Sequence, residues 1–352
     1  MVVDGDALDT VRPMLASRVP MEPAANVVTP SVSSPRLRRL LYWMIVLELA
    51  LQIVFVVVLL IGERSQLSLF VLYAPRQPLL AVAVVAALLA PLTKRRVRAL
   101  VAIQCVACFV ILVPVMGLHL GHKRSSEFPV RLASYNVFFG KLGRPALLDE
   151  IAAMPADIIL LQATYGSMGE IVKKRFPERS THMYDDFVLL TRYKIVKVEE
   201  PPALPDGTFP KFVGYVLETD SGPLRVFNVH PSSPRHAMFG DEEGNANTRH
   251  REEQIAAAVA AARRESTPFI IVGDTNLPIL SSIARRQLSD LHDAFDDVGF
   301  GFGYTFPAKR PWMRIDRAFG TDGIHFVDVR VADRGASDHR ALFVDFDIDQ
   351  HR

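Results

Sequence analysis

Cysteine is scarce in this sequence, since its 352 residues include only two, Cys105 and Cys108. Both fall inside one long apolar run, so the polar remainder of the chain has no cysteine that could form a disulfide. A domain of that size can bury a sufficient core without such a bond. Cysteine usage therefore indicates neither an oxidising nor a reducing compartment.

A strong charge of one sign is also missing. The chain has 40 Lys and Arg against 38 Asp and Glu, which leaves a formal net charge of +2. Because this net charge is close to zero, it gives no reason by itself to expect a nucleic-acid partner. The sequence also contains no internal repeat.

Apolar residues are abundant instead. They make up 49% of the chain, and the mean hydropathy of +0.19 is too high for an ordinary soluble enzyme of this charge content. The excess lies in the first third of the sequence. A spanning helix needs about 20 apolar residues, with roughly 17 as the lower limit. The apolar runs therefore predict three transmembrane helices, over residues 40–62, 77–93 and 99–121.

The positive charges predict how these helices are oriented. The first run starts too far into the chain, and is too long, to be a cleavable signal peptide. Three arginines precede it within residues 36–39, and four Lys or Arg residues lie within 94–98. Cytoplasmic loops collect such residues. We therefore expect a flexible cytoplasmic tail over 1–39 and a multi-pass protein of the plasma (inner) membrane, with an extracytoplasmic domain over 122–352.

Polar side chains interrupt the apolar runs at three positions. Glu48 and Gln52 share one face of the first predicted helix, and Gln104 of the third could meet them. An intramembrane carboxyl can serve in transport. The alternative is hydrogen bonding between helices, and three short spans with few polar groups make a poor transport pathway.

From residue 130 onward, short apolar runs alternate with helical stretches, which is typical of a layered α/β or α+β domain. The predicted helices are 145–154, 168–176 and 249–264. The predicted strands are 130–138, 157–162, 186–191, 211–218, 224–230, 269–273, 313–319 and 341–346.

Polar residues stand at or just past the ends of several of these strands, where a sheet presents side chains to a shared cleft. Oxygen ligands suit a hard cation such as Mg²⁺, and histidines can transfer protons or bind an anion. Taken singly, such motifs are also common in turns and solvated loops. The residues are Asn136, His230, Asp274, Asn276, Asp316, Ser337, Asp338 and His339.

In their order and spacing, these motifs resemble those of the endonuclease/exonuclease/phosphatase superfamily, which includes pancreatic deoxyribonuclease, apurinic endonucleases, sphingomyelinases and inositol phosphatases. The resemblance covers residues 130–348. It implies an α+β fold, a four-layer α/β/β/α sandwich, that follows the transmembrane region. It also implies a divalent cation, Mg²⁺ or Mn²⁺, at Asn136 and Asp338.

The resemblance implies roles for the remaining residues too. His339, oriented by Asp316, would activate a water molecule for in-line attack on phosphorus. His230, Asp274 and Asn276 would bind and polarise the phosphate, and Asp274 could handle protons as the leaving group departs.

The second motif departs from the family pattern. The family usually has Leu-Gln-Glu, with the Glu as a main metal ligand, whereas this chain has Ala163 after Leu161 and Gln162. A site with fewer charges could still hold Mg²⁺ loosely. Candidate substitutes are Asp149, Glu150, Glu170, Asp185 and Asp186, and we expect the last two at the surface.

Residues 309–314 and Thr305 can each be interpreted in more than one way. Residues 309–314, Lys-Arg-Pro-Trp-Met-Arg, could grip a polyanion or rest on lipid, or could form a hairpin with a packed Trp312. Thr305 resembles a family position near the phosphate, and otherwise it is simply a residue that favours strands.

The sequence therefore predicts a membrane-anchored, divalent-metal-dependent phosphoesterase. Its partners would be the bilayer and a phosphorylated substrate, such as nucleic acid or a phospholipid headgroup, and no protein partner is inferable. The alternative is a pseudoenzyme that binds a phosphorylated ligand without turnover, because Ala163 removes a ligand.

The orientation can be tested with fused reporters. A reporter that works only outside the cytoplasm should be active when fused after His351, because the basic residues retain the 36–39 and 94–98 segments inside. Activity only from a fusion within 94–98 would reverse the topology.

Overall fold

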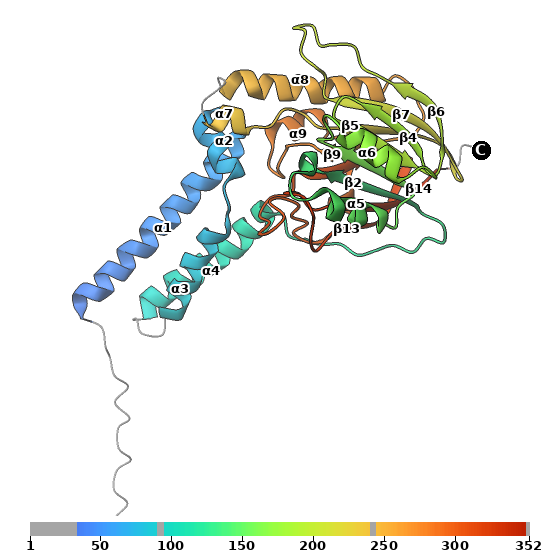
Figure 1. Cartoon of the computed structure of the whole chain (residues 1–352). Helices are drawn as coiled ribbons and strands as arrows, with labels where there is room; N and C mark the ends of the chain where they lie inside the picture. Colours follow the sequence, from blue (N-terminus) through green and yellow to red (C-terminus); the bar gives the residue numbers. More distant parts are fainter. Residues whose placement is uncertain (1–33, 90–94, 240–243, 350–352) are drawn as a thin grey trace, which may run out of the picture.

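The protein consists of a helical arm joined to a larger domain of two sheets with helices around them (Figure 1). The computed structural model describes residues 34–89, 95–239 and 244–349. Residues 1–33, the greater part of the tail predicted over 1–39, lie outside the described residues.

The domain is built on two six-stranded sheets that mix parallel and antiparallel pairs. The first sheet has the order β13-β14-β2-β3-β5-β4 and contains β2 (Val130–Asn136), β3 (Ile158–Gln162), β4 (Ser180–Tyr184), β5 (Phe187–Thr191), β13 (Ile324–Val331) and β14 (Leu342–Ile348). The second has the order β10-β12-β9-β8-β7-β6 and contains β6 (Lys194–Glu199), β7 (Phe212–Thr219), β8 (Gly222–Val229), β9 (Phe269–Asp274), β10 (His292–Asp293) and β12 (Asp316–Gly320).

Helices cover the outer face of each sheet, so the domain has four layers. Leu147 and Val172 belong to helices on the first sheet, and Ala258 to a helix on the second. A third core fills the space between the sheets, where Leu160 and Val272 are buried. The predicted α+β sandwich is confirmed. The domain's helices are α5 (Arg144–Ala152), α6 (Met168–Arg175), α7 (Arg235–Phe239), α8 (Gly244–Ala262), α9 (Ser282–Gln287), α10 (Ala294–Val298) and the 3-10 turn Phe138–Gly140.

The central strands of each sheet were predicted from the sequence. The strands β4, β6, β10 and β13 were not. These four are the edge strands of the two sheets. Edge strands carry polar side chains that blunt pairing with other chains, and β6 exposes Lys194 and Lys197. The central β3 and β9 are buried along their whole length, which explains their unbroken apolar runs.

A buried polar contact joins the two sheets near the ends of their central strands. The side-chain nitrogen of Gln162 in β3 donates to Asn228 Oδ1 in β8 over 2.7 Å, and Asn228 Nδ2 donates to the Leu161 carbonyl over 3.2 Å. Because the interior is apolar around them, these bonds restrict how one sheet can shift on the other.

The arm contains α1 (Pro35–Ile61), α3 (Gln77–Leu89) and α4 (Arg95–Met116), and α2 (Gln66–Tyr73) lies where the arm meets the domain (Figure 1). Two segments are long and apolar enough to cross a membrane, Tyr42–Ile61 and Arg98–Met116.

The span predicted at 99–121 needs correction in its bounds, and the span predicted at 77–93 is described only in part. The described part of α3 has 13 residues, fewer than the roughly 17 that a span requires, and residues 90–93 lie outside the described part of the chain. α4 ends at Met116 because Gly117 adopts a φ of +74°. The next residues form β1 (His119–Leu120), which pairs with β11 (Phe300–Gly301) of the domain.

Within the arm, the polar residues bond to one another. Gln52 donates to Glu48 over 3.1 Å within α1, and Gln104 of α4 donates to the other Glu48 oxygen. Of the two alternatives for these residues, transport and hydrogen bonding between helices, the structure contains the hydrogen bonding.

The segment between α1 and α3 is bound tightly to the domain. Glu63 is buried and accepts bonds from the Ser281 hydroxyl and from both the backbone and the hydroxyl of Ser282, at the start of α9. Tyr73 at the end of α2 donates to the Asn276 carbonyl and accepts from Arg251 Nη1. Glu63, between α1 and α2, and Tyr73 of α2 therefore pair with buried polar groups of the domain.

We expect Glu63→Ala to lower the free energy of unfolding by about 1–3 kcal/mol, because it leaves the buried Ser281 and Ser282 groups without their acceptor. The measurement is the unfolding midpoint of the full chain in detergent. Glu127→Ala, at an exposed position, is the matched control and should change stability by less than about 0.5 kcal/mol. Equal effects of the two substitutions would contradict this role of Glu63.

Candidate functional site

Six of the eight polar residues singled out in the sequence line one cleft of about 570 Å³, and the other two, Asp316 and Ser337, are buried. Asn136 ends β2 and Asp274 ends β9, while His230 follows β8 directly. Strands from both sheets thus deliver their ends to one place. The residues lining the cleft include Asn136, Ala163, His230, Asp274, Asn276, Asp338 and His339.

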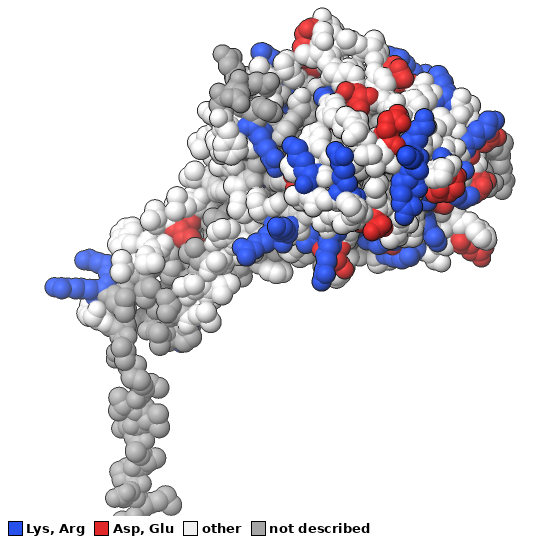
Figure 2. Space-filling model, in the orientation of Figure 1, with Lys and Arg blue, Asp and Glu red and all other residues white. Residues whose placement is uncertain are grey.

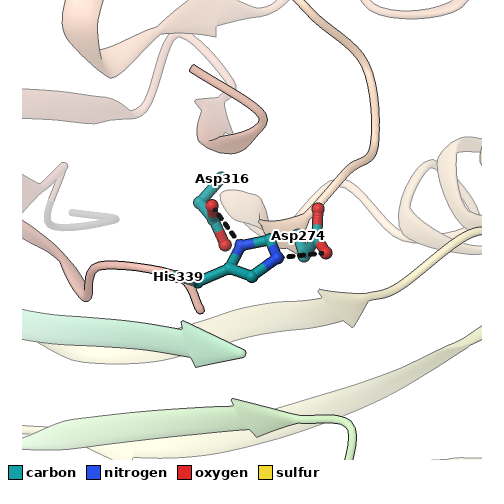
Figure 3. A group of neighbouring side chains, drawn as sticks. All are labelled: Asp274, Asp316 and His339. Carbon is teal, nitrogen blue, oxygen red and sulfur yellow. Dashed lines mark hydrogen bonds and ion pairs between the residues drawn. The ribbon is translucent and has the colours of Figure 1, made fainter. Parts of the chain in front are cut away.

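His339 lies between two aspartates (Figure 3). Its Nδ1 is 2.8 Å from Asp316 Oδ2 and its Nε2 is 3.6 Å from Asp274 Oδ2. The two aspartates are direct partners in the antiparallel pairing of β12 with β9. Asp316 and Asp274 are almost completely buried. The β ladder therefore fixes the two carboxylates on either side of the imidazole.

This environment changes the acidity of both partners. Burial disfavours a charged imidazole, but Asp316 and Asp274 outweigh it and raise the pKa of His339 to about 9. Burial also raises the pKa of Asp274, while His339 and His230 oppose that shift and Asp316 reinforces it. Both shifts arise because two carboxylates and an imidazole share one buried site.

Gly273 permits the close approach of β8 and β9 at this end of the sheet. A Cβ atom there would lie 2.0 Å from the Val229 carbonyl oxygen. The next residues of the two strands are His230 and Asp274, and His230 Nε2 is 3.7 Å from Asp274 Oδ2. The Gly-Asp sequence thus has a steric reason as well as a chemical one.

Asp186 is part of the site, although the sequence placed it at the surface. It is fully buried, and its Oδ2 is 2.6 Å from His230 Nδ1. Burial lowers the pKa of His230, but the bond and charge of Asp186 outweigh it, so the net shift is upward. Asp185, next to it, is exposed and lies 3.5 Å from Lys211 Nζ. The prediction was wrong for Asp186 because a turn hides its side chain under His230.

Two asparagines surround Asp274. Asn136 Nδ2 donates to Asp274 Oδ2 over 2.9 Å, and Asn136 Oδ1 accepts from the backbone of Phe138 over 3.0 Å. Asn276 has a φ of +50°, and its backbone nitrogen donates to Asp274 Oδ1 over 3.0 Å. Asn276 Nδ2 donates to the Pro231 carbonyl. Both amides are therefore held in place beside the carboxylate.

The cleft offers oxygen atoms that could bind a hard cation, but these atoms carry little negative charge. Asp338 is partly exposed at the cleft, and Ser337 Oγ, which donates to the Asn136 carbonyl over 2.7 Å, fixes its loop beside β2. Ala163 lines the same cleft and supplies no ligand. Among the described residues, one group brings three acidic or histidine ligand atoms within 4.8 Å, namely Asp274, Asp316 and His339. Its Asp316 and His339 atoms already bond to each other.

The other candidate substitutes for the missing carboxylate do not line the cleft. Glu150 accepts from the Tyr135 hydroxyl over 2.9 Å and from the Ala336 backbone over 2.7 Å, which gives it a structural role. Asp149 and Glu170 are exposed on α5 and α6.

Thr305 and Trp312 lie behind and beside the site. Thr305 is fully buried, and its hydroxyl accepts from the Asp316 backbone over 3.2 Å, so it supports the start of β12. Trp312 lines the cleft and donates through Nε1 to the Tyr73 carbonyl over 3.2 Å. Of the alternatives for residues 309–314, the packed Trp312 is what the structure contains.

The sequence did not indicate the apolar part of the cleft. Phe70 and Tyr73 of α2 line it, together with Met238 and Phe239 of α7. The one signal for α2 was Ser65, whose hydroxyl accepts from the Ser68 backbone and caps the helix.

The geometry can be compared with known proteins. The model of the endonuclease/exonuclease/phosphatase family matches residues 133–339, more than half of the chain. D. rerio TDP2 complexed with single-strand DNA product is similar over 63% of this chain and 100% of that chain, with 16% identity and a TM-score of 0.50. The 3′ phosphatase NExo from Neisseria, bound to a product DNA hairpin, is similar over 62% and 99%, with 18% identity and a TM-score of 0.50.

At these identities, the likeness to solved structures concerns the fold. No curated protein matches the sequence. The family match spans all the strand ends that form the cleft, from β2 to the loop that carries His339. This chain belongs to the endonuclease/exonuclease/phosphatase family.

Proposed function

We propose that this protein is a membrane-anchored phosphoesterase that hydrolyses a phosphodiester or phosphomonoester with the help of a divalent cation. The observation that supports it most is His339, held between Asp316 and Asp274 at the bottom of a cleft lined by polar strand ends. A buried imidazole that a carboxylate orients at the edge of a polar cleft is suited to general-base chemistry.

The anchor is the helical arm. Its visible surface carries few charged side chains, while the domain carries both signs (Figure 2). α1 runs toward the domain, α3 runs away from it and α4 returns (Figure 1). This path suits three passes of a multi-pass protein of the plasma membrane. The basic residues at the start of α1 and at the start of α4, both far from the domain, favour a cytoplasmic side there and an extracytoplasmic domain.

His339 and Asp316 would act as a unit. In its neutral form, which a pKa of about 9 favours at alkaline pH, His339 has Nδ1 held by Asp316 and Nε2 left to accept a proton from a water molecule that attacks phosphorus. Asp316 would stabilise the imidazolium that forms. Thr305 supports this pair, since its hydroxyl binds the backbone of Asp316.

His230, Asp274 and Asn276 would bind the phosphate and assist the leaving group. Burial lowers the pKa of His230, but Asp186 raises it more, and this net shift favours the protonated form that attracts an anion. Asp274, whose pKa burial raises, can carry a proton to the departing oxygen. The new phosphorus–oxygen bond then comes from water, and the bond to the leaving oxygen breaks.

Asn136 and Asp338 are the residues that would hold Mg²⁺ or Mn²⁺. Both line the cleft and offer oxygen atoms, which these cations prefer. A divalent cation, when bound, supplies positive charge that polarises the phosphate and disfavours the imidazolium form of His339.

A pseudoenzyme of the same fold is the second candidate. Ala163 favours it, because this residue lines the cleft at the position of the family's carboxylate and no described acidic residue replaces it there. Such a protein would bind a phosphorylated ligand through the same residues without turnover.

The first test concerns His339. His339→Ala should reduce turnover of a chromogenic phosphodiester by roughly 100- to 10,000-fold or more, because it removes the general base. Asp316→Asn should reduce it less, since the imidazole remains but loses its orientation and charge support. His325→Ala is the control, since His325 is exposed and pairs with Asp349 outside the cleft. Near-normal turnover by His339→Ala would reject the mechanism.

The second test concerns metal affinity. With one carboxylate fewer, the wild-type protein should require a high Mg²⁺ concentration and should favour the more easily dehydrated Mn²⁺. Ala163→Glu should lower the metal concentration needed and raise Mg²⁺-supported hydrolysis. Both forms are titrated with each metal by calorimetry and by rate. Ala163→Ser, which adds no charge, is the control.

Two outcomes would overturn this account of the metal. If the wild type binds Mg²⁺ tightly and Ala163→Glu weakens binding, another carboxylate has taken the role. If neither form binds metal or hydrolyses any phosphate ester, the pseudoenzyme is the correct interpretation.

A further inference from the structure

The cleft has an apolar wall that the proposed chemistry does not use. This wall starts at the imidazole, where the Phe306 ring centroid is 4.8 Å from that of His339. Phe306 packs in one hydrophobic cluster with Trp312 and with Leu72 and Tyr73 of α2. The apolar surface is therefore continuous from the reacting end of the cleft to the helix that follows the first membrane span.

The outer rim of the wall is aromatic and uncovered. Phe70 of α2 and Phe239 of α7 meet edge to face, with ring centroids 5.7 Å apart. Both line the cleft, and they remain 40% and 74% exposed. Phenylalanine pairs that contact water at the mouth of a site commonly mark an apolar ligand or a lipid surface.

α2 has apolar side chains on both of its faces. Leu69 and Leu72 are buried against the domain, whereas Leu67 is 67% exposed beside Phe70. α2 also starts five residues after α1 ends at Ile61, the end of the candidate span. A helix with an outward apolar face, directly after a membrane helix, suits the interface of the bilayer.

The cleft carries little of the charge that a nucleic-acid groove needs. Among the described residues that line it, Arg235 is the one Lys or Arg side chain, and it lies over the Phe306 ring at 5.1 Å. A single arginine can neutralise one phosphate group, whereas a nucleic-acid strand presents a charge at every nucleotide.

We propose that the substrate is an amphiphilic phosphate ester, with its phosphate beside His339 and its hydrocarbon chain along the wall formed by Phe306, Trp312 and Phe70. This inference rests on the proposed phosphoesterase function and names its substrate class. The chain would lie toward α2, so that a lipid could enter the cleft from the membrane surface without leaving the bilayer completely.

The test uses the full-length protein in nanodiscs with two para-nitrophenyl phosphodiesters, one with an ethyl and one with an octyl chain, both below their critical micelle concentrations. Each methylene group that is buried can raise kcat/KM by up to about fourfold, so we expect the octyl ester to exceed the ethyl ester by roughly tenfold or more. Phe70→Ser and Phe239→Ser should each reduce this octyl-to-ethyl ratio by about threefold or more.

Phe128→Ser is the matched control, because Phe128 is 85% exposed and does not line the cleft. It should leave the ratio unchanged. A ratio near one in the wild type, or an equal ratio in all four proteins, would overturn the inference while leaving the phosphoesterase function intact. Faster cleavage of a single-stranded oligonucleotide than of the octyl ester would also overturn it. Failure to hydrolyse the two diesters and the corresponding octyl phosphomonoester would instead reject the proposed function.

Discussion

The pairing of Asp316 with Asp274 across the β9–β12 ladder is the constraint on which the site depends. The pairing fixes the positions of two buried carboxylates relative to each other, and His339 lies between them. Neither carboxylate could remain charged in this interior without a positive partner nearby. The loop of His339 is held in place by two bonds: the Arg340 backbone nitrogen donates to the Thr305 carbonyl, and the Ser337 hydroxyl donates to the Asn136 carbonyl at the end of β2.

The second feature that connects the structure is the position of α2 between the arm and the cleft. Tyr73 bonds to the carbonyl of Asn276, whose own backbone nitrogen bonds to Asp274. A short path of hydrogen bonds thus links the end of α2 to the centre of the site. If the arm crosses a bilayer, the same helix places the apolar side of the cleft next to lipid. The geometry of the site and the access of substrate to it would then both depend on α2.

The sequence predicted the central strands and the residues at their ends, because buried strands have unbroken apolar runs and polar residues interrupt them sharply. It did not predict the edge strands, whose polar side chains face water, or α2, whose eight residues give too short a pattern. Asp186 was misplaced because its exposed neighbour Asp185 forms a turn, and only tertiary packing brings Asp186 beneath His230. The roles assigned to His339 and the other cleft residues remain predictions.

The most direct test of the central claim is the fate of oxygen during turnover. A phosphodiester would be hydrolysed by the full-length protein in water labelled with heavy oxygen, and the products would be analysed by mass spectrometry. Attack by a water molecule at phosphorus predicts one heavy oxygen atom in the phosphate product and none in the released alcohol. Label in the alcohol, or no product above the uncatalysed background, would contradict the account.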